Sequence, residues 1–286
     1  MSQTIYEMVT STIMNALKEG VIPWRRPWNV QAITPINIVS NKGYRGINMF
    51  LLGLAPYADH RWLTLKQAGE LGGRIIQGQK AAMVIFWKHW QPKDDQEAEQ
   101  TDVRKRVPIL RYYNVFNVEQ CEGLSVPELY QPPTIKENQR IERAELLVQS
   151  MPDPPTIQEY GTSAWYRPIE DTIQIPPLKT FDSADSYYST LFHELGHASG
   201  HEKRLNRSGV TGQILFGSGD YSKEELVAEL TSAFCCATVS LDNSLLQNAA
   251  SYIDGWLSVL RNDPKAVVIA AAQAQKAADL IRGVTY

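Results

Sequence analysis

The segment that most constrains the fold is residues 193–197, which read HELGH. In an α-helix, side chains four residues apart lie on one face, so His193 and His197 can direct their imidazole nitrogens at one metal ion. Glu194 lies about 100° around the helix from His193, beside such an ion without binding it. From there its carboxylate can accept a proton from a zinc-bound water, whose pKa falls to about 7. The segment therefore predicts a zinc site with Glu194 as the catalytic base.

The residues before this motif predict that it lies on an amphipathic helix. Ser183 can cap the start of that helix. Apolar side chains then recur at spacings of three and four, as a buried helix face requires. This stripe consists of Tyr187, Tyr188, Leu191, Phe192 and Leu195.

A catalytic zinc site needs a third protein ligand and one open position. The segment after residue 222 predicts a helix on which Glu225 and Glu229 share a face. Glu225 has another explanation, because Ser222 and Glu225 fit a capping box. Glu229 lies among apolar residues, where an unpaired carboxylate is costly, so we expect Glu229 to be the ligand.

Two alternatives for the third ligand stay open. In many metallopeptidases the first of two acids on this helix binds the metal and the second orients a histidine, which makes Glu225 the ligand and Glu229 its neighbour. His201 is the less favoured alternative, because Gly196 and Gly200 predict that the motif helix ends near it. The chain has no C-x-x-C motif. The ion is therefore expected to be zinc, or another divalent metal, held by histidine and carboxylate.

Charge is distributed unevenly along the chain. Residues 1–128 contain 15 Lys and Arg against 12 Asp and Glu, a net charge of +3, whereas the whole chain carries −3. The remaining residues contain 13 against 19, a net charge of −6. A basic segment joined to an acidic one predicts that the first binds an anionic partner.

The overall composition is typical of a globular protein, with 43% apolar and 21% charged residues. No run of about 18 apolar residues is present, so we expect no membrane association. Three cysteines cannot form a disulfide framework, and the first residues lack the pattern of a signal peptide. These features predict a cytoplasmic protein.

Aromatic and basic residues alternate in residues 22–28, IPWRRPW, where the prolines favour extended backbone. Arg25 and Arg26 can bind phosphates, and Trp24 and Trp28 can stack on unpaired bases. The alternative is that both tryptophans are core or turn residues. The segment alone does not decide between the two.

A second cluster of this kind occupies residues 42–48, KGYRGIN. Its two glycines let the backbone approach a ligand closely. Lys42, Tyr44, Arg45 and Asn48 supply charge, an aromatic ring and an amide, which suit nucleic-acid binding. The same residues are also consistent with a structural turn before a helix.

Two strands are predicted in the first half, at residues 83–90 and 109–118, by their apolar runs and alternation. Polar residues fill the intervening segment 91–107, which predicts a loop. We therefore expect the two strands to pair antiparallel across that loop.

The second of these strands carries candidate nucleic-acid contacts. Arg111 and Tyr113 are two residues apart and share one face of the strand. A small sheet that exposes tyrosine and arginine suits base stacking. Burial in the core is expected of Phe86 and Phe116 rather than of Tyr112 or Tyr113.

Proline-rich residues 131–134 predict a linker, so the expected organisation is a first domain at 1–128, a linker at 129–135 and a second domain at 136–286. Helices are expected at 3–19, 136–151, 222–234, 251–260 and 264–281. Short strands are expected at 156–158, 164–166 and 172–175. The expected fold class is α+β in both domains, with a small sheet in the first.

Five motifs in this chain recur in the same order in one known family: residues 22–28, 44–48, 115–120 with Gly123, 193–197 with Gly200 and His201, and 224–229. Over nearly its whole length the chain resembles this family, the ArdC antirestriction proteins, which are related to the N-terminal part of the TraC conjugative primase. The resemblance implies an N-terminal single-stranded DNA-binding domain and a C-terminal zincin-like metallopeptidase domain. It also implies a plasmid-borne role in shielding DNA from restriction enzymes after conjugation.

Three functions are compatible with these features. The favoured one is a DNA-protection protein that binds single-stranded DNA without sequence preference and carries a metallopeptidase-like domain. The alternative is an active zinc metalloprotease whose first domain brings it to DNA-bound targets. A protein substrate or a restriction enzyme is the expected protein partner. In the third, the metal only holds helices together.

Overall fold

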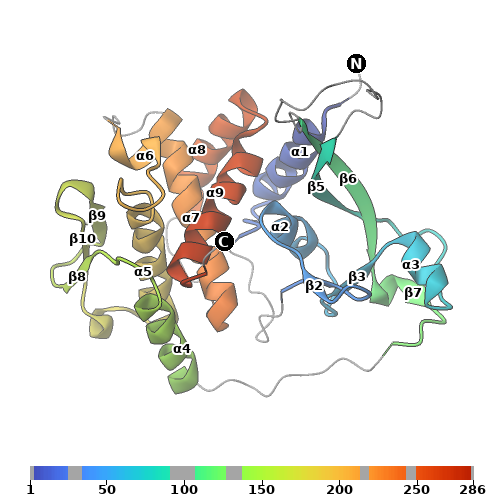
Figure 1. The fold of residues 1–286 in the computed structure, drawn as a ribbon, viewed down its shortest axis with the longest axis horizontal. Helices are drawn as coiled ribbons and strands as arrows, with labels where there is room; N and C mark the ends of the chain where they lie inside the picture. The colour runs from blue at the N-terminus through green and yellow to red at the C-terminus, as the bar shows by residue number, and fades with distance from the viewer. Residues whose placement is uncertain are drawn as a thin grey trace, which may run out of the picture.

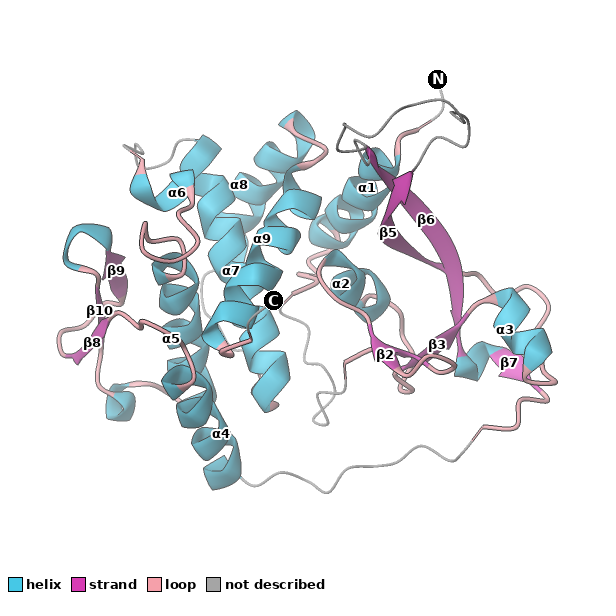
Figure 2. Ribbon diagram, in the orientation of Figure 1, coloured by secondary structure: helices cyan, strands magenta, loops and turns pink. Residues whose placement is uncertain are grey.

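A computed structural model describes residues 3–24, 34–90, 107–126, 137–212, 219–242 and 249–284. It has an N-terminal domain built around a sheet, beside a mainly helical C-terminal domain (Figure 1). Figure 2 shows that the strands of the two domains lie at opposite ends of the molecule, with helices between them. The expected α+β fold class is confirmed. Within the described ranges, no helix is both long and apolar enough to cross a membrane.

A five-stranded sheet organises the N-terminal domain, in the order β2-β1-β3-β6-β5. Its strands are β1 (Ile36–Asn37), β2 (Lys42–Gly43), β3 (Arg61–Leu63), β5 (Ala82–Trp90) and β6 (Val107–Asn117). β1 and β3 pair in parallel, and the other neighbours pair antiparallel. A second, two-stranded sheet joins β4 (Arg74–Ile75) to β7 (Cys121–Glu122).

Short helices accompany this sheet: α1 (Ile5–Lys18), α2 (Ile47–Gly53), α3 (Leu65–Glu70) and the 3-10 turn η1 (Val118–Gln120). α1 confirms the helix expected at residues 3–19. It begins with a capping box, in which the Thr4 hydroxyl accepts a hydrogen bond from the Glu7 N–H and the Glu7 carboxylate accepts one from the Thr4 N–H.

β5 and β6 form a long antiparallel ribbon, as predicted (Figure 1). Residues that face each other across such a pair lie on the same side of the sheet. Phe86 and Arg111 therefore lie on one side of the ribbon, and Ile85 and Tyr112 on the other. The residues of the predicted loop up to 106 lie outside the described ranges.

α2 covers the free edge of β5 through one side chain. Asn48 accepts a hydrogen bond from the N–H of Ile85 at 2.8 Å and donates one to the C=O of Ile85, also at 2.8 Å. The side-chain amide thus takes the place of a neighbouring strand at this edge. Asn48 is buried, so the structure gives it this structural role in place of the nucleic-acid contact expected from the sequence.

We expect Asn48→Ala to lower the free energy of unfolding by about 2 kcal/mol, because both peptide groups of Ile85 lose their partner in a buried site. Urea denaturation measures this loss. Asn114→Ala is the matched control, since Asn114 is exposed on β6 of the same ribbon and should change stability by less than about 0.5 kcal/mol. Equal losses in the two variants would contradict the role assigned to Asn48.

The C-terminal domain contains the helices α4 (Glu137–Gln149), α5 (Ala184–Ala198), α6 (Ser208–Thr211), α7 (Gly219–Val239), α8 (Ala249–Asn262) and α9 (Ala266–Ile281). Its strands are β8 (Thr156–Glu159), β9 (Trp165–Arg167) and β10 (Thr172–Ile175), in the order β8-β10-β9. The 3-10 turns η2 (Pro168–Glu170) and η3 (Leu178–Thr180) flank β10. Each helix and strand predicted here is found, although α7 begins at Gly219, before the predicted start at residue 222.

One hydrophobic core runs through both domains. Trp24 is fully buried and meets Trp256 of α8 edge-on, with the ring centroids 5.1 Å apart. Phe50 of α2 stacks on Phe234 of α7, with the centroids 4.9 Å apart. The domains therefore meet through apolar surface. The predicted linker at 129–135 lies outside the described residues, and the exact domain boundaries stay a prediction.

Candidate functional site

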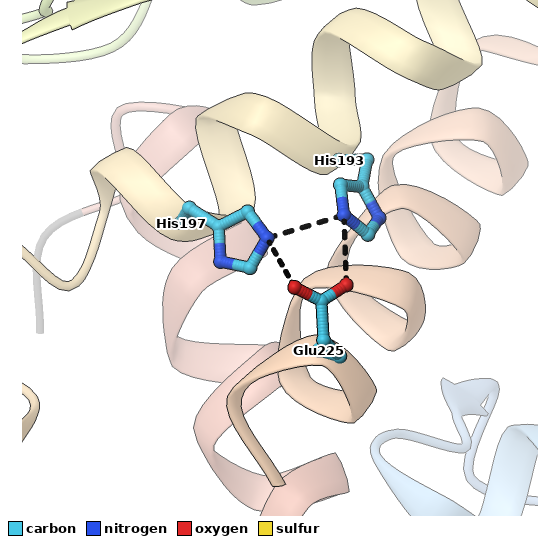
Figure 3. Close-up of side chains that lie close together, drawn as sticks. All are labelled: His193, His197 and Glu225. Carbon is cyan, nitrogen blue, oxygen red and sulfur yellow. Dashed lines mark hydrogen bonds and ion pairs between the residues drawn. The ribbon is translucent and has the colours of Figure 1, made fainter. Parts of the chain in front are cut away.

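The HELGH motif lies on α5, which begins as predicted. Ser183 caps the helix by accepting a hydrogen bond from the Ser186 N–H at 3.1 Å. Gly196 lets α5 approach α7 closely, because a Cβ at this position would lie 3.0 Å from the Cα of Ala228. This contact brings acidic residues of α7 opposite the two histidines (Figure 3).

Three side chains converge between α5 and α7. The Nε2 atoms of His193 and His197 are 3.1 Å apart. The Glu225 carboxylate lies 3.5 Å from Nε2 of His193 and 3.6 Å from Nε2 of His197. Figure 3 shows the three side chains pointing toward one another. Among the residues that the structure describes, they form the group of His, Cys, Asp or Glu side chains close enough to share one ion.

The spacing of these donor atoms suits zinc or a similar divalent ion. Zinc binds nitrogen and oxygen donors at about 2.0–2.1 Å, so two donors at corners of a tetrahedron lie about 3.3 Å apart. The observed separations of 3.1, 3.5 and 3.6 Å are close to that edge length. Three protein donors also leave a fourth position for water or substrate.

The geometry favours Glu225, the alternative considered above, over Glu229 as the third ligand. Glu225 reaches the Nε2 atoms of both histidines. Oε1 of Glu229 lies on the other side of His193, 3.7 Å from its Nδ1. Glu229 therefore lies beside the ring nitrogen of His193 that faces away from the cluster, where its charge can orient the ring, and it is not placed to share the ion.

The structure also bears on the capping box expected at Ser222 and on His201 as an alternative ligand. α7 begins at Gly219, so Ser222 lies inside the helix and not at its N-cap, where a capping box would place it. His201 is not part of the described cluster. Its Nδ1 instead accepts a hydrogen bond from the Lys203 N–H at 3.2 Å, in the turn after α5.

Carboxylates dominate the electrostatics around His193. Burial favours its neutral ring, but the hydrogen bond with Glu225 and the charges of Glu229 and Glu194 outweigh it and raise the pKa of His193 to about 9. Burial also acts to raise the pKa of Glu225, yet its contacts with His193 and His197 lower that pKa to about 2. The surplus of carboxylates makes the site attractive to a cation.

Sequence reasoning missed the carboxylate behind His197. Oε1 of Glu224 lies 3.5 Å from Nδ1 of His197, and Arg207 forms an ion pair with Glu224 at 2.5 Å. The acidic pair at 224 and 225, at the start of an apolar helix, was the available signal for Glu224. No spacing along the chain links Arg207 to it.

Glu194 lies beside the cluster and is 7% exposed. Its negative charge contributes to the raised pKa of His193. Within the described part of the chain, its carboxylate makes no hydrogen bond or ion pair. This arrangement leaves the carboxylate available to accept a proton from a bound molecule, as a catalytic base must.

Those residues expected to bind nucleic acid that the structure describes do not form one surface. Trp24 is 0% exposed, so its burial in the core leaves no ring face for a base. Tyr44 is also buried, at 6% exposed. Arg25, Arg26 and Trp28 lie outside the described residues.

Part of the second cluster lies at the domain interface. Lys42 is exposed on β2. Arg45 forms an ion pair with Asp279 of α9, while 52% of its side chain remains exposed. The N–H of Gly46 donates a hydrogen bond to the side-chain oxygen of Gln275 at 3.0 Å. The turn expected as an alternative reading thus connects the two domains.

An aromatic and basic surface covers the outer part of the ribbon. Phe86 and Tyr113 are 46% and 44% exposed, and their rings meet edge-on with centroids 5.9 Å apart. Arg111 faces Phe86 across the ribbon, and Lys88 is exposed on the same side. We call these four residues the ribbon patch. Phe86, expected in the core, is exposed because the buried part of this side ends at Val84.

Comparison with known proteins identifies both domains. Residues 3–116 match the family model of the N-terminal domain of anti-restriction factor ArdC, and residues 142–273 match that of a zincin-like metallopeptidase. The metal-free crystal structure of the antirestriction ArdC protein from the R388 plasmid matches with a TM-score of 0.79 and 32% identity, over 98% of this chain and 97% of that one. The chain belongs to the ArdC family. As a family member, it is an antirestriction protein with a zincin-like domain.

Other relatives of this ArdC-family chain agree with the assignment. An uncharacterized protein of Sinorhizobium fredii, y4eC, is 38% identical over 286 residues, which cover 96% of this chain and 90% of that protein. The DNA primase TraC of Escherichia coli is 34% identical over 295 residues, but this match covers only 27% of the primase. The chain therefore corresponds to a part of TraC.

The ArdC protein from R388 also has a Mn(II)-bound crystal structure, which matches with a TM-score of 0.77 and 31% identity over 98% of this chain. The zincin-like fold implies a divalent metal, and the donor atoms found between α5 and α7 are consistent with one. The fold and the local geometry thus point to the same place in the molecule.

Proposed function

We propose that this ArdC-family protein protects DNA in the cytoplasm by binding single strands on the ribbon patch. Its zincin-like domain, in this proposal, holds a zinc ion between His193, His197 and Glu225. The main observation in support of single-strand binding is the exposure of two aromatic rings beside two cations on one side of the β5–β6 ribbon. The similarity to part of a DNA primase supports it.

The chemistry of the ribbon patch favours single strands over duplexes. Phe86 and Tyr113 can stack only on bases whose faces are not covered by pairing partners. Arg111 and Lys88 can bind the phosphates of the same strand. Stacking and charge are tolerant of sequence, so binding without sequence preference is expected.

Fluorescence anisotropy with a labelled oligothymidylate tests this proposal. We expect binding that weakens as salt rises, because cations bound to the strand are released. A matched duplex should bind more weakly under the same conditions. Absence of single-strand binding at low salt, or duplex binding of equal strength, would refute the proposed DNA-protection mechanism.

The residues of the zincin-like domain can support peptide hydrolysis. A divalent ion bound there supplies Lewis acidity, which polarises a peptide carbonyl and makes water more acidic. Glu194 is placed to accept a proton from an attacking water and later to donate it to the leaving amine. His193, His197 and Glu225 would hold the ion, since their donor atoms lie close enough to share one.

An active metalloprotease is the second candidate function, favoured by the buried Glu194 carboxylate beside the cluster. Glu194→Gln decides between the candidates, because it keeps the shape of the side chain but removes the base. We expect this variant to bind zinc and single strands normally and to protect a transferred plasmid from restriction in cells. Loss of protection with both kinds of binding intact would favour the protease.

A further inference from the structure

Behind the cluster, the carboxylate of Glu224 lies between His197 and Arg207. The guanidinium of Arg207 donates hydrogen bonds to both carboxylate oxygens of Glu224, from Nη2 to Oε1 at 2.5 Å and from Nε to Oε2 at 3.1 Å. Oε1 also lies 3.5 Å from Nδ1 of His197. Both residues are buried, with Glu224 6% and Arg207 8% exposed, so this contact is shielded from bulk water.

Arg207 is also joined to the helix that carries the motif. Its Nη1 donates to the Ser199 hydroxyl at 2.7 Å, and its Nη2 donates to the Gly196 carbonyl at 2.7 Å. Its own N–H donates to the Gly200 carbonyl at 2.9 Å. A cation at this end of α5 is favoured by the helix dipole. Arg207 therefore holds the last turn of α5 and Glu224 of α7 in one fixed arrangement.

The arrangement determines which nitrogen of His197 is free to bind a metal. A neutral imidazole has one N–H donor and one acceptor nitrogen. When Nδ1–H donates to Glu224, Nε2 keeps its lone pair, and Nε2 is the atom that faces His193 and Glu225. A buried carboxylate keeps its charge and its position only with a partner, which Arg207 supplies.

We propose that Arg207 and Glu224 are a positioning pair, which fixes the tautomer and ring orientation of His197 and thereby sets the metal affinity of the site. Neither residue touches the ion or the substrate. The inference rests on the proposed metal site, since it explains how His197, one of the ligands of that site, is oriented.

The substitutions Arg207→Met and Glu224→Ala each remove one half of the pair. We expect both to weaken zinc binding by about 10- to 100-fold, the usual effect of removing a partner behind a metal-ligating histidine. Arg207→Lys keeps the charge but cannot make the bidentate hydrogen bonds to Glu224. Its zinc affinity should therefore lie between those of the wild type and Arg207→Met. Competition with a chromophoric chelator measures the affinity for zinc alone.

Arg204→Met is the matched control. Arg204 lies in the same turn, is more deeply buried at 1% side-chain exposure and also donates to a carbonyl of α5, that of Ala198, at 2.7 Å. It pairs with Asp171 and not with Glu224. We expect Arg204→Met to lower the melting temperature without changing the zinc affinity of the folded protein.

Gly209→Ala disturbs the pair without changing either member. A Cβ at Gly209 would lie 2.8 Å from Oε2 of Glu224, so the carboxylate has to move. Zinc affinity should fall in this variant too. It provides the test if Arg207→Met does not fold.

A second readout needs no metal. The ring-nitrogen chemical shifts of His197 distinguish its two tautomers in the metal-free protein. We expect the wild type to carry the proton on Nδ1 and Glu224→Ala to lose this preference. Unchanged ring shifts in Glu224→Ala would overturn the inference whatever the affinities are.

Further outcomes separate this inference from the proposed metal site. If folded Arg207→Met and Glu224→Ala bind zinc like the wild type, or no more weakly than Arg204→Met, the positioning role is wrong. If the wild type binds no better than His193→Ala, the metal site itself fails, and the ring-shift comparison alone then decides the role of the pair.

Discussion

Glu225→Ala is expected to weaken zinc binding far more than Glu229→Ala. Zinc held by four protein ligands gains about 10–16 kcal/mol, so each ligand contributes about 2.5–4 kcal/mol and its loss costs roughly 60- to 700-fold in affinity. Glu229 lies 3.7 Å from Nδ1 of His193, away from the Nε2 atom that faces the cluster. Its removal should cost about 10-fold, at the low end for such partners.

Isothermal titration of the two metal-free variants with zinc measures this difference. The pair is well matched, because both carboxylates lie on α7 and are similarly buried, at 9% and 7% exposed. Melting temperatures of the metal-free variants provide the control for folding. A larger loss in Glu229→Ala than in Glu225→Ala would restore the ligand set first expected from the sequence.

The second large effect is expected on DNA binding. The double substitution Phe86→Ala and Tyr113→Ala removes both rings of the ribbon patch. Stacking of a base on an aromatic ring contributes about 1–3 kcal/mol, so together the two changes should weaken single-strand binding by at least roughly 30-fold. Replacement of Arg111 should instead reduce the salt dependence of binding, because fewer phosphates are neutralised.

The opposite side of the ribbon provides the control. Trp87 and Tyr112 are as exposed as the patch residues, at 52% and 47%, but they lie on the other side of β5 and β6. The double substitution Trp87→Ala and Tyr112→Ala should leave single-strand affinity nearly unchanged. If it weakens binding more than the patch substitution does, the DNA lies on the other side.

The metal motif could be predicted because its geometry is local. Two histidines four residues apart on a helix share a face wherever that helix packs, and Ser183 marks its start. The third ligand is different, because its choice depends on how α7 is rotated against α5. The contact of Gly196 with Ala228 sets that packing. Burial could not identify the ligand, since Glu224, Glu225 and Glu229 are all buried.

The N-terminal domain shows the same limit. An apolar run and an alternating segment predicted the β5–β6 ribbon, because the pattern of a strand is carried by its own residues. Whether an individual aromatic side chain is buried or exposed depends on residues far away in the sequence. Trp24 is buried by Trp256, which lies far along the chain on α8, whereas Phe86 extends past the point where the core ends. Neither outcome follows from residues close in sequence.

The aromatic contacts that cross the domain interface affect how the protein can be dissected. Trp24 packs against Trp256 and Phe50 against Phe234, so large buried rings of the two domains are in direct contact. A fragment that ends between the domains would carry this surface uncovered, and exposed apolar patches of that kind promote aggregation. Conversely, a chain cleaved between residues 126 and 137 after folding should stay together as a complex of two pieces. Function is therefore better assigned with point substitutions in the intact chain than with truncated halves.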